Sequence, residues 1–344
     1  MRRLGNTLYV TTQGTLLSKE GEAIRVGREG VPPLRLPIHG IDSILCFGGV
    51  TITPPLLGHC AEHGVTVSWL TENGRFLARA EGPVRGNVLL RRTQYRASDD
   101  PLRSAALARA IVVGKVFNQR HVLRRYLRDH GTECTQADRD RLERTADRLS
   151  RTLSDLERDL PLDAVRGLEG DAGANYFGAF SALIRVPEFP FEGRARRPPT
   201  DPVNALLSFV YTLLTHDARS ALEGVGLDPA VGFLHRDRPG RPSLALDLVE
   251  EFRAWFADRL ALSLINRRQL QPDDFEAHPA GGVTMTERGR KTVLVAYQER
   301  KREEVRHPFT DETLTIGLLW HVQARLMAGA LRGDLDGYPP FVAR

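Results

Sequence analysis

Two glutamates stand in helical rows that are otherwise mostly apolar. Glu250 belongs to a row spaced by four, four, three and four residues, which places its members on one side of a helix: Leu246, Glu250, Ala254, Ala257 and Ala261. The same stretch has a second apolar face, made of Leu248, Val249, Phe252, Trp255 and Phe256. A helix that is apolar on two sides is typically buried. The sequence therefore predicts that Glu250 lies inside the protein, with Asp247 one turn earlier on the adjoining flank.

Glu169 repeats this pattern upstream. It is the only charge in a row with helical spacing: Val165, Glu169, Ala172, Tyr176, Phe180 and Leu183. Small residues surround it, namely Gly167, Gly170, Gly173 and Ala174, so another helix or a ligand can approach closely. Each glycine weakens a helix by about 1 kcal/mol, which some other interaction must offset.

Two buried carboxylates require positive partners. An unpaired buried carboxylate costs several kcal/mol or takes up a proton. One solution is a pair of buried salt bridges to arginine, which is plentiful here. The other is a divalent metal held by Glu169, Glu250 and His235, which lies in the loop "GFLHRDRPGRPS". Periodicity alone leaves both solutions open.

The composition is that of a soluble globular protein. Of 344 residues, 41% are hydrophobic and 26% are charged, and no apolar run approaches the ~20 residues of a membrane span. With no signal-peptide pattern at the N-terminus, we expect a cytoplasmic protein without a membrane partner. Cys46, Cys60 and Cys134 are too widely spaced for a thiolate zinc site. The net charge is +5 and nearly all basic residues are arginine, a weak sign of a polyanionic partner.

The elements divide into a β part and an α part. Short β-branched or aromatic runs separated by turn signals fill residues 1–87: "TLYVTT", "SILCFGG", "VTVSWLT" and "RFLARAEG". From about Asp100 the period becomes helical, with two long helices up to about 160 and further helices at about 163–184, 202–223, 243–265 and 311–330. The predicted fold is α+β: a small N-terminal β-sheet domain (1–87), a linker (88–101) and a larger all-α domain (102–344). The segment "GDLDGYPPFVAR" is expected to be a tail.

Three other patterns carry less weight. "HCAEH" (59–63) fits the H-x-x-E-H zinc-helix pattern, but no later glutamate stands in an obvious partner helix, so a short helix with Cys60 facing inward is favoured. The nucleotide-binding patterns G-x-x-x-x-G-K-[ST] and G-x-G-x-x-G after a strand are absent. The basic helix "KVFNQRHVLRRYLRDH", which begins at Lys115, is interpreted as a solvated face.

The motifs taken together resemble a known family. "RGLEGDAGANYF", "NALLSFVYTLL", "AVGFLHRDRPGRPSLALDLVEEFR" and "GRKTVLVAYQERK" occur in one order and spacing that is similar to the CRISPR-associated integrases, the endonucleases that insert new spacers. The N-terminal "LPIHGIDSILCFGGVTITPPLLGHCAEHGVTVSWL" is similar to that family's β domain, so the resemblance covers essentially the whole chain. The motif "DLVEEFR" and the compact loop before it are most similar to the sequences of the type I-C lineage.

The resemblance implies a site and a chemistry. Matched motif to motif, Glu169, His235 and Glu250 would be the catalytic metal ligands, with Asp247 beside the metal. Glu251 would point away. The metal would be Mn²⁺ or Mg²⁺, which suits carboxylate and imidazole ligands. Contacts to DNA are expected from the loop arginines and two tyrosines: Arg236, Arg238, Arg241, Tyr176 and Tyr211.

The resemblance also implies partners. These are double-stranded DNA fragments and CRISPR repeat DNA, a second copy of the chain joined through the β domain, a small ferredoxin-like adaptation protein and a RecB-like exonuclease. Two other functions fit the same residues: a structure-specific DNase in repair that performs no strand transfer, and a non-catalytic DNA-binding scaffold whose buried acids pair with arginines.

Overall fold

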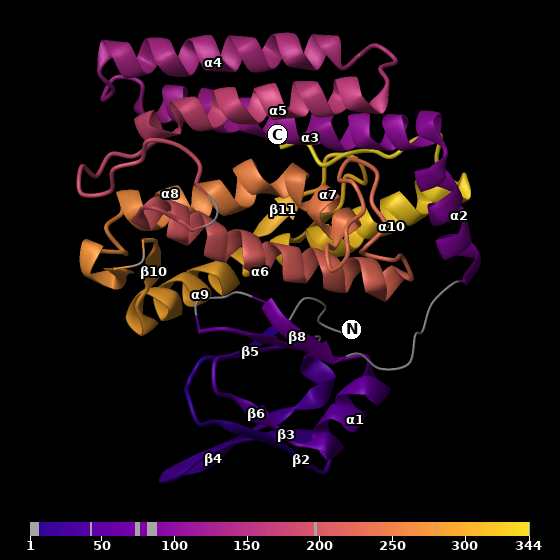
Figure 1. Cartoon of the computed structure of the whole chain (residues 1–344), viewed down its shortest axis with the longest axis vertical. Helices are drawn as coiled ribbons and strands as arrows, with labels where there is room; N and C mark the ends of the chain where they lie inside the picture. The colour runs from indigo at the N-terminus through magenta and orange to yellow at the C-terminus, as the bar shows by residue number, and fades with distance from the viewer. Residues whose placement is uncertain are drawn as a thin grey trace. The chain divides into compact units, whose positions relative to one another are not determined.

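The computed structural model describes residues 7–41, 43–72, 76–80, 88–195, 198–279 and 281–343. The chain forms two compact units, unit 1 (Met1–Gly86) and unit 2 (Asn87–Arg344). Figure 1 shows the elements of both units.

Unit 1 contains two four-stranded sheets. The first has the order β1-β5-β7-β8, in which β1, β5 and β7 run parallel and β8 runs antiparallel to β7. Its strands are β1 (Thr7–Val10), β5 (Ser43–Phe47), β7 (Thr66–Leu70) and β8 (Phe76–Ala80). The second sheet has the order β4-β3-β2-β6, with strands β2 (Leu16–Glu20), β3 (Ala23–Arg28), β4 (Val31–Pro37) and β6 (Thr51–Ile52). The short helices are η1 (Ile38–Gly40) and α1 (Pro54–His63).

One apolar core joins these elements. Leu17 and Ile24 from the second sheet, Ile44 from the first and Leu56 from α1 are all fully buried in it. Cys60 is 1% exposed in the same core, which confirms that a short helix turns this residue inward. Helix α1 begins at a proline, whose fixed φ suits the first helical position. It ends at Gly64, whose φ of 70° is a left-handed conformation that glycine adopts without strain.

Unit 2 is mainly helical. Its helices are α2 (Val88–Asp99), α3 (Pro101–His130), α4 (Gln136–Asp155), α5 (Leu162–Ala179), α6 (Pro202–Val225), α7 (Ser243–Phe252), α8 (Arg259–Asn266), α9 (Glu287–Arg302) and α10 (Leu319–Arg332). Short segments join them: η2 (Phe180–Leu183), η3 (Arg253–Asp258), η4 (Pro272–Asp274), η5 (Ile316–Leu318), and the two-stranded pairs β9 (Phe275–Ala277) with β10 (Val283–Met285) and β11 (Glu304–Arg306) with β12 (Thr313–Thr315).

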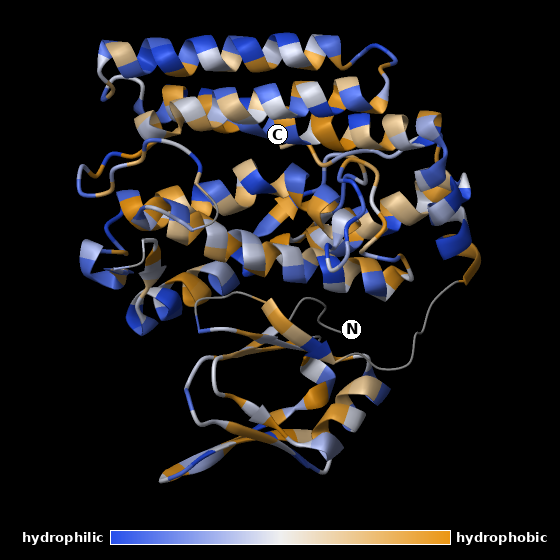
Figure 2. Ribbon diagram, viewed as in Figure 1, coloured by the Kyte–Doolittle hydropathy of each residue, from blue (hydrophilic) through white to orange (hydrophobic). Residues whose placement is uncertain are grey.

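Helix α3 is the element around which the site is built, because it packs against α4, α5 and α7. Its N-terminus is fixed by Asp100, whose carboxylate accepts hydrogen bonds from the backbone amides of Leu102 and Arg103. The outer helix α4 is mostly hydrophilic (Figure 2), and its buried side is a stripe that includes Leu142, Ala146 and Leu149. This helix is the second of the two long helices expected before about residue 160.

The α+β class is confirmed, with an N-terminal sheet region followed by a mostly helical unit. The linker expected at 88–101 is wrong, because residues 88–99 form α2 within unit 2. The expected tail is also wrong. Tyr338, Phe341 and Ala343 are each at most 5% exposed, and Asn118 in α3 holds the backbone of the last two through both ends of its amide.

The helix expected at 243–265 is interrupted. Between α7 and α8 the segment η3 (Arg253–Asp258) is a π-helical turn, a rare and locally widened form that is frequent at functional sites. It contributes Arg253 and Asp258 to the site described below. The helix expected at 311–330 begins later, at Leu319, after strand β12 and η5, and α9 was not expected.

Candidate active site

Glu169 and Glu250 meet across one lysine. Glu250, on α7, has a side chain that is 1% exposed, and Glu169, on α5, has one that is 27% exposed. The Nζ atom of Lys115, on α3, forms an ion pair with Glu250 Oε2 at 2.8 Å and a close contact with Glu169 Oε1. Three helices thus bring two acids and one base to a single point. The prediction that Glu250 is buried is confirmed.

A second cation contacts Glu250 from the π-helical turn. Arg253 Nη1 lies 2.7 Å from Glu250 Oε1. Burial by itself raises the pKa of Glu250, but the positive charges of Arg253, Lys115 and His235 outweigh burial and hold the pKa at about 2. Glu250 is therefore a carboxylate at neutral pH.

His235 is held in place by Asp247. The Asp247 carboxylate is fully buried and accepts four hydrogen bonds at 2.6 to 3.0 Å, from the backbone amides of Phe233, Leu234 and His235 and from His235 Nδ1. Because Nδ1 donates to Asp247, the lone pair of neutral His235 is on Nε2, which lies 3.9 Å from Glu250 Oε1. All lone pairs of Asp247 are thereby engaged, so it orients the histidine.

The turn before His235 depends on a glycine. A Cβ atom on Gly232 would lie 2.7 Å from Asp247 Oδ2 and 2.8 Å from the backbone carbon of Ser243. Arg166 on α5 fixes the other side of the turn, since its Nε donates to the carbonyl oxygen of Leu234 at 2.7 Å.

These residues fit a divalent metal. Glu250 Oε2 is buried and, apart from its ion pair with Lys115, has no hydrogen-bonding partner of good geometry. A histidine whose second nitrogen is held by a carboxylate is the usual orientation of a metal-binding imidazole. In the structure, however, Lys115 stands between the two glutamates. Among the described residues, one group of three possible metal ligands has its ligand atoms within 4.8 Å of one another. That group lies in unit 1 and contains none of these residues. Glu169, His235 and Glu250 would hold an ion together only after the ammonium group of Lys115 moves aside.

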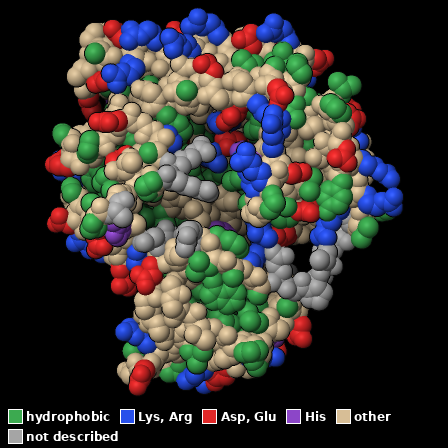
Figure 3. Space-filling view, in the orientation of Figure 1, with side chains coloured by type: hydrophobic (Ala, Val, Ile, Leu, Met, Phe, Trp, Pro, Cys, Tyr) green, Lys and Arg blue, Asp and Glu red, His purple; other side chains and the backbone are tan. Residues whose placement is uncertain are grey.

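Two clefts open on this centre. A cleft of about 570 Å³ is lined by Glu169, His235 and all three loop arginines expected to contact DNA, Arg236, Arg238 and Arg241. A second, of about 460 Å³, is lined by Lys115, Glu169, Glu250, Arg253 and Tyr211, among others. In Figure 3, basic and acidic side chains lie beside one another around a hollow in the helical unit. The arrangement can bind a phosphate group through arginine beside the carboxylates.

Both tyrosines that were expected to contact DNA bind Asp258. Tyr176 is fully buried and donates a hydrogen bond to Asp258 Oδ2 at 3.0 Å, so it is a core residue and not a DNA contact. Tyr211 donates to Asp258 Oδ1 at 2.5 Å, and the guanidinium carbons of Arg194 and Arg253 lie 5.3 and 5.0 Å from the centroid of its ring. Burial raises the pKa of Asp258 to about 6, against the effect of the two tyrosine hydrogen bonds.

Sequence reasoning missed Lys115 and Arg253. Lys115 was assigned to a solvated face, yet it is 7% exposed. The signal was present, because Lys115 falls in a helical row with Ile111, Asn118 and Val122, all of which are buried. Arg253 follows Glu250 by three residues, but the π-helical turn that aims it cannot be derived from a regular helical period.

Comparison with known proteins places this chain in a family. The family model "CRISPR associated protein Cas1" matches residues 8–299. The chain is 53% identical over 346 residues to "CRISPR-associated endonuclease Cas1 1" of Chlorobaculum tepidum, covering 100% of both chains, and 54% identical over 344 residues to "CRISPR-associated endonuclease Cas1 2" of Rhodospirillum rubrum, covering 99% of both. The chain belongs to the CRISPR-associated Cas1 family.

Solved structures share the fold. The Cas1 protein TM1797 from Thermotoga maritima has a TM-score of 0.81 at 23% identity, over 95% of this chain and 97% of that one. A casposase bound to integration product has a TM-score of 0.84 at 22% identity, over 98% and 94%.

Two further matches belong to larger proteins. A Geobacter sulfurreducens protein named "CRISPR-associated exonuclease Cas4/endonuclease Cas1 fusion" is 36% identical over 99% of this chain and 61% of its own length. A chain of a Cas6-RT-Cas1–Cas2 complex has a TM-score of 0.83 at 22% identity, over 100% of this chain and 36% of that one.

Within the described part of the chain, the helices are all too short or too polar to cross a membrane.

Proposed function

We propose that this protein is a metal-dependent DNA endonuclease and integrase that inserts short DNA fragments into a CRISPR array. The observation that carries the proposal is the meeting of Glu169, Glu250 and Asp247-oriented His235 beside an arginine-lined cleft, in a member of the Cas1 family. Relatives over the full length are named endonucleases.

The residues have distinct roles in this proposal. Glu169, His235 and Glu250 would hold Mn²⁺ or Mg²⁺, which would polarise a phosphodiester and stabilise charge on the attacking and leaving oxygens. Asp247 keeps the imidazole in the tautomer that presents Nε2. Arg236, Arg238 and Arg241 would bind phosphates at the mouth of the cleft, where they orient the strand for attack by water or by a DNA 3′-hydroxyl.

A strand-transfer assay tests the proposal. The substrates are a plasmid carrying a CRISPR repeat and a short duplex with free 3′-hydroxyls, in Mn²⁺ or Mg²⁺. We expect joined product from the unmodified protein and at least a 100-fold loss in Glu169→Gln, His235→Gln and Glu250→Gln. The control is Glu157→Gln, an exposed carboxylate after α4. Cleavage without joined product in either metal would contradict the integrase assignment and favour a structure-specific DNase.

A non-catalytic DNA-binding scaffold has one specific observation in its favour. Both glutamates are already paired with cations, Lys115 and Arg253, as a structural salt-bridge network would be. The two functions differ in the activity of the unmodified protein. If no metal supports cleavage or joining by the unmodified protein, the scaffold is the correct assignment. If the three ligand variants cleave and join DNA like the unmodified protein, the metal-site assignment is wrong.

We also propose the partners. They are a RecB-like exonuclease and a small ferredoxin-like adaptation protein, in a type I-C-like system of the cytoplasm. The exonuclease fusion of Geobacter and the Cas2-containing complex support cooperation with an exonuclease and with a second adaptation protein. Self-association through unit 1 is supported by exposed apolar side chains there, such as Val31, Leu34 and Leu77, each more than half exposed. Sedimentation of the protein alone and with each partner tests these assemblies; a monomer at all concentrations would contradict the dimer.

A further inference from the structure

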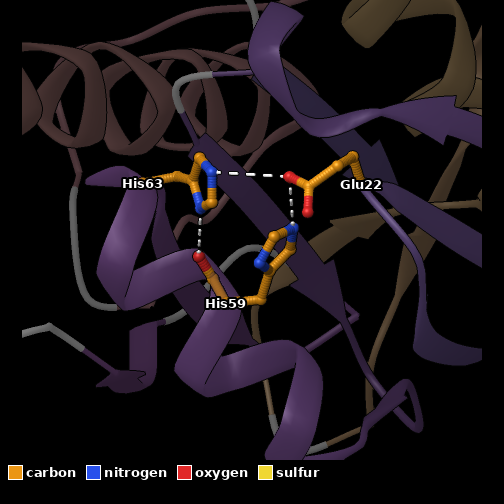
Figure 4. Close-up of side chains that lie close together, drawn as sticks. All are labelled: Glu22, His59 and His63. Atoms are coloured by element: carbon orange, nitrogen blue, oxygen red, sulfur yellow. Dashed lines mark hydrogen bonds and ion pairs between the residues drawn. The ribbon is translucent and has the colours of Figure 1, made fainter.

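Unit 1 contains a compact group of metal-binding side chains that the proposed function does not use. His59 and His63 lie four residues apart on α1, and Glu22 comes from the turn between β2 and β3 (Figure 4). Glu22 Oε2 lies 3.6 Å from His59 Nε2 and 3.7 Å from His63 Nε2. One ligand atom from each residue lies within 4.8 Å of the others.

His59 is unusual because it is a buried polar side chain without a hydrogen-bonding partner. It is only 2% exposed, and neither of its ring nitrogens has a hydrogen-bonding partner. Buried polar groups in native proteins are rarely left without one. Burial, together with the nearby charge of Lys19, lowers the pKa of His59, so the neutral imidazole that binds metals is the favoured form. At 3.6 Å, Glu22 is too distant to satisfy Nε2 directly.

His63 is already oriented toward the same point. Its Nδ1 donates a hydrogen bond to the carbonyl oxygen of His59 at 2.9 Å. A carbonyl oxygen only accepts, so neutral His63 carries its proton on Nδ1 and its lone pair on Nε2, which is the atom nearest Glu22. This backbone contact is the kind that fixes the tautomer of metal-binding histidines.

We propose that Glu22, His59 and His63 bind a Zn²⁺ ion in unit 1. Around a tetrahedral zinc ion with bonds of about 2.0–2.2 Å, neighbouring ligand atoms lie about 3.3–3.6 Å apart. The two glutamate-to-histidine distances, 3.6 and 3.7 Å, lie at the upper end of this range or just above it. His39 Nε2 lies 3.8 Å from Glu22 Oε2 but outside the group of three, so a water molecule or a repositioned His39 would complete the coordination.

The ligand chemistry selects the ion. Two or three imidazoles with a single carboxylate suit zinc, whereas Mg²⁺ prefers oxygen ligands. The ion would connect α1 to the β2–β3 turn, two elements that otherwise pack through apolar side chains such as Leu17 and Leu56. We therefore assign it a structural role. The H-x-x-E-H pattern then marks two zinc ligands, while the third comes from upstream and not from a later helix.

The test is zinc binding by the full-length protein. The protein is stripped with EDTA, and Zn²⁺ affinity is measured by competition with a chromophoric chelator, with Co²⁺ absorption as an independent report of nitrogen and oxygen ligation. We expect one tight site, weakened at least tenfold by Glu22→Gln and by His63→Gln. These side chains are 65% and 30% exposed, so their replacement leaves no cavity in the core. Circular dichroism checks that each variant folds.

Two controls separate this site from the proposed active site. His278→Gln replaces an exposed histidine of unit 2 and should leave zinc binding unchanged. His235→Gln should also retain the tight zinc. The inference is overturned if the unmodified protein binds no zinc tightly, if folded Glu22→Gln and His63→Gln bind it as tightly as the unmodified protein, or if the tight zinc is lost in His235→Gln and kept in His63→Gln.

Discussion

The net charge of the proposed active site depends on Lys115. Its ammonium group contacts both glutamates, so it supplies the positive charge that a metal would otherwise supply. Two acids brought together without a cation repel each other, and the buried one is costly to leave unpaired. A metal and Lys115 therefore compete for the same oxygens, and the outcome can be measured as stability.

Replacing Lys115 should make folding depend on metal. In Lys115→Met, we expect the metal-free protein to lose roughly 2 kcal/mol of unfolding free energy, less than the ~3–5 kcal/mol of a fully buried pair because Glu169 is partly exposed. Added Mn²⁺ should recover this loss. Thermal unfolding with and without Mn²⁺ measures both, with exposed Lys291→Met as the matched control. If Mn²⁺ raises the stability of Lys115→Met and of the unmodified protein equally, the lysine does not compete with the metal.

Asp247 acts through His235 rather than on the metal. In Asp247→Asn, one oxygen becomes an NH₂ group that cannot accept from the loop amides, so the turn and the imidazole lose their alignment. We expect Mn²⁺ affinity to fall about 10- to 100-fold, and DNA cleavage to fall less than in Glu250→Gln. Isothermal titration and cleavage rates measure the two effects. A loss of metal binding equal to that of Glu250→Gln would make Asp247 a direct ligand.

At the scale of elements, the loop before His235 depends on Gly232. An added Cβ would meet both the Asp247 carboxylate and the backbone of Ser243 at under 3 Å, and backbone cannot move aside cheaply. We expect Gly232→Ala to lower the unfolding free energy by about 1–3 kcal/mol and to reduce cleavage strongly. Gly224→Ala is the control, since nothing lies within 4 Å of the added atom there. Denaturant unfolding of both variants tests this; equal midpoints would show that the loop accommodates the methyl group.

The sequence predicted the structure correctly where the hydrophobic residues recur at a regular helical or strand spacing. It did not do so where packing against other elements determines the local geometry. The burial of Glu250 followed from its apolar row, and all four expected strands lie in one sheet. The second sheet went unnoticed because its strands are polar or mostly exposed, as in Val31–Pro37 with its prolines. The π-helical turn and the burial of Lys115 depend on packing between helices. This packing cannot be predicted from the residue spacing within one helix.

At the scale of the whole molecule, the excess of arginine predicts electrostatic binding to DNA. Arg238 is exposed in the loop that lines the cleft beside Glu169 and His235. Each phosphate contact releases counterions, so affinity falls steeply with salt. We expect Arg238→Ala to weaken DNA binding at low salt and to reduce the slope of log affinity against log salt by about 1. Fluorescence anisotropy over a salt series measures the slope, with exposed Arg302→Ala for comparison. An unchanged slope in Arg238→Ala would remove this arginine from the DNA surface.

The C-terminal segment makes the stability of unit 2 depend on pH through Glu251. This glutamate faces away from the site and accepts hydrogen bonds from Tyr338, Gln323 and the amide of Phe341, all buried contacts. Burial raises the pKa of Glu251 from 4.5 to about 8 despite these hydrogen bonds. The folded state therefore binds a proton that the unfolded state releases between these values. Its contribution to stability is present below about pH 4.5 and is lost as the pH rises through about 8.

Glu251→Gln should remove this dependence, because the amide mimics the protonated acid and does not titrate. We expect the stability of the variant relative to the unmodified protein to improve from pH 5 to about pH 8 and to level off by pH 9. Urea midpoints across this range measure the difference, and Glu299→Gln, an exposed carboxylate on α9, should show no comparable trend. A difference that stays constant with pH would mean that Glu251 is ionised in the folded protein, which would place its negative charge among Tyr338, Gln323 and Phe341 at neutral pH.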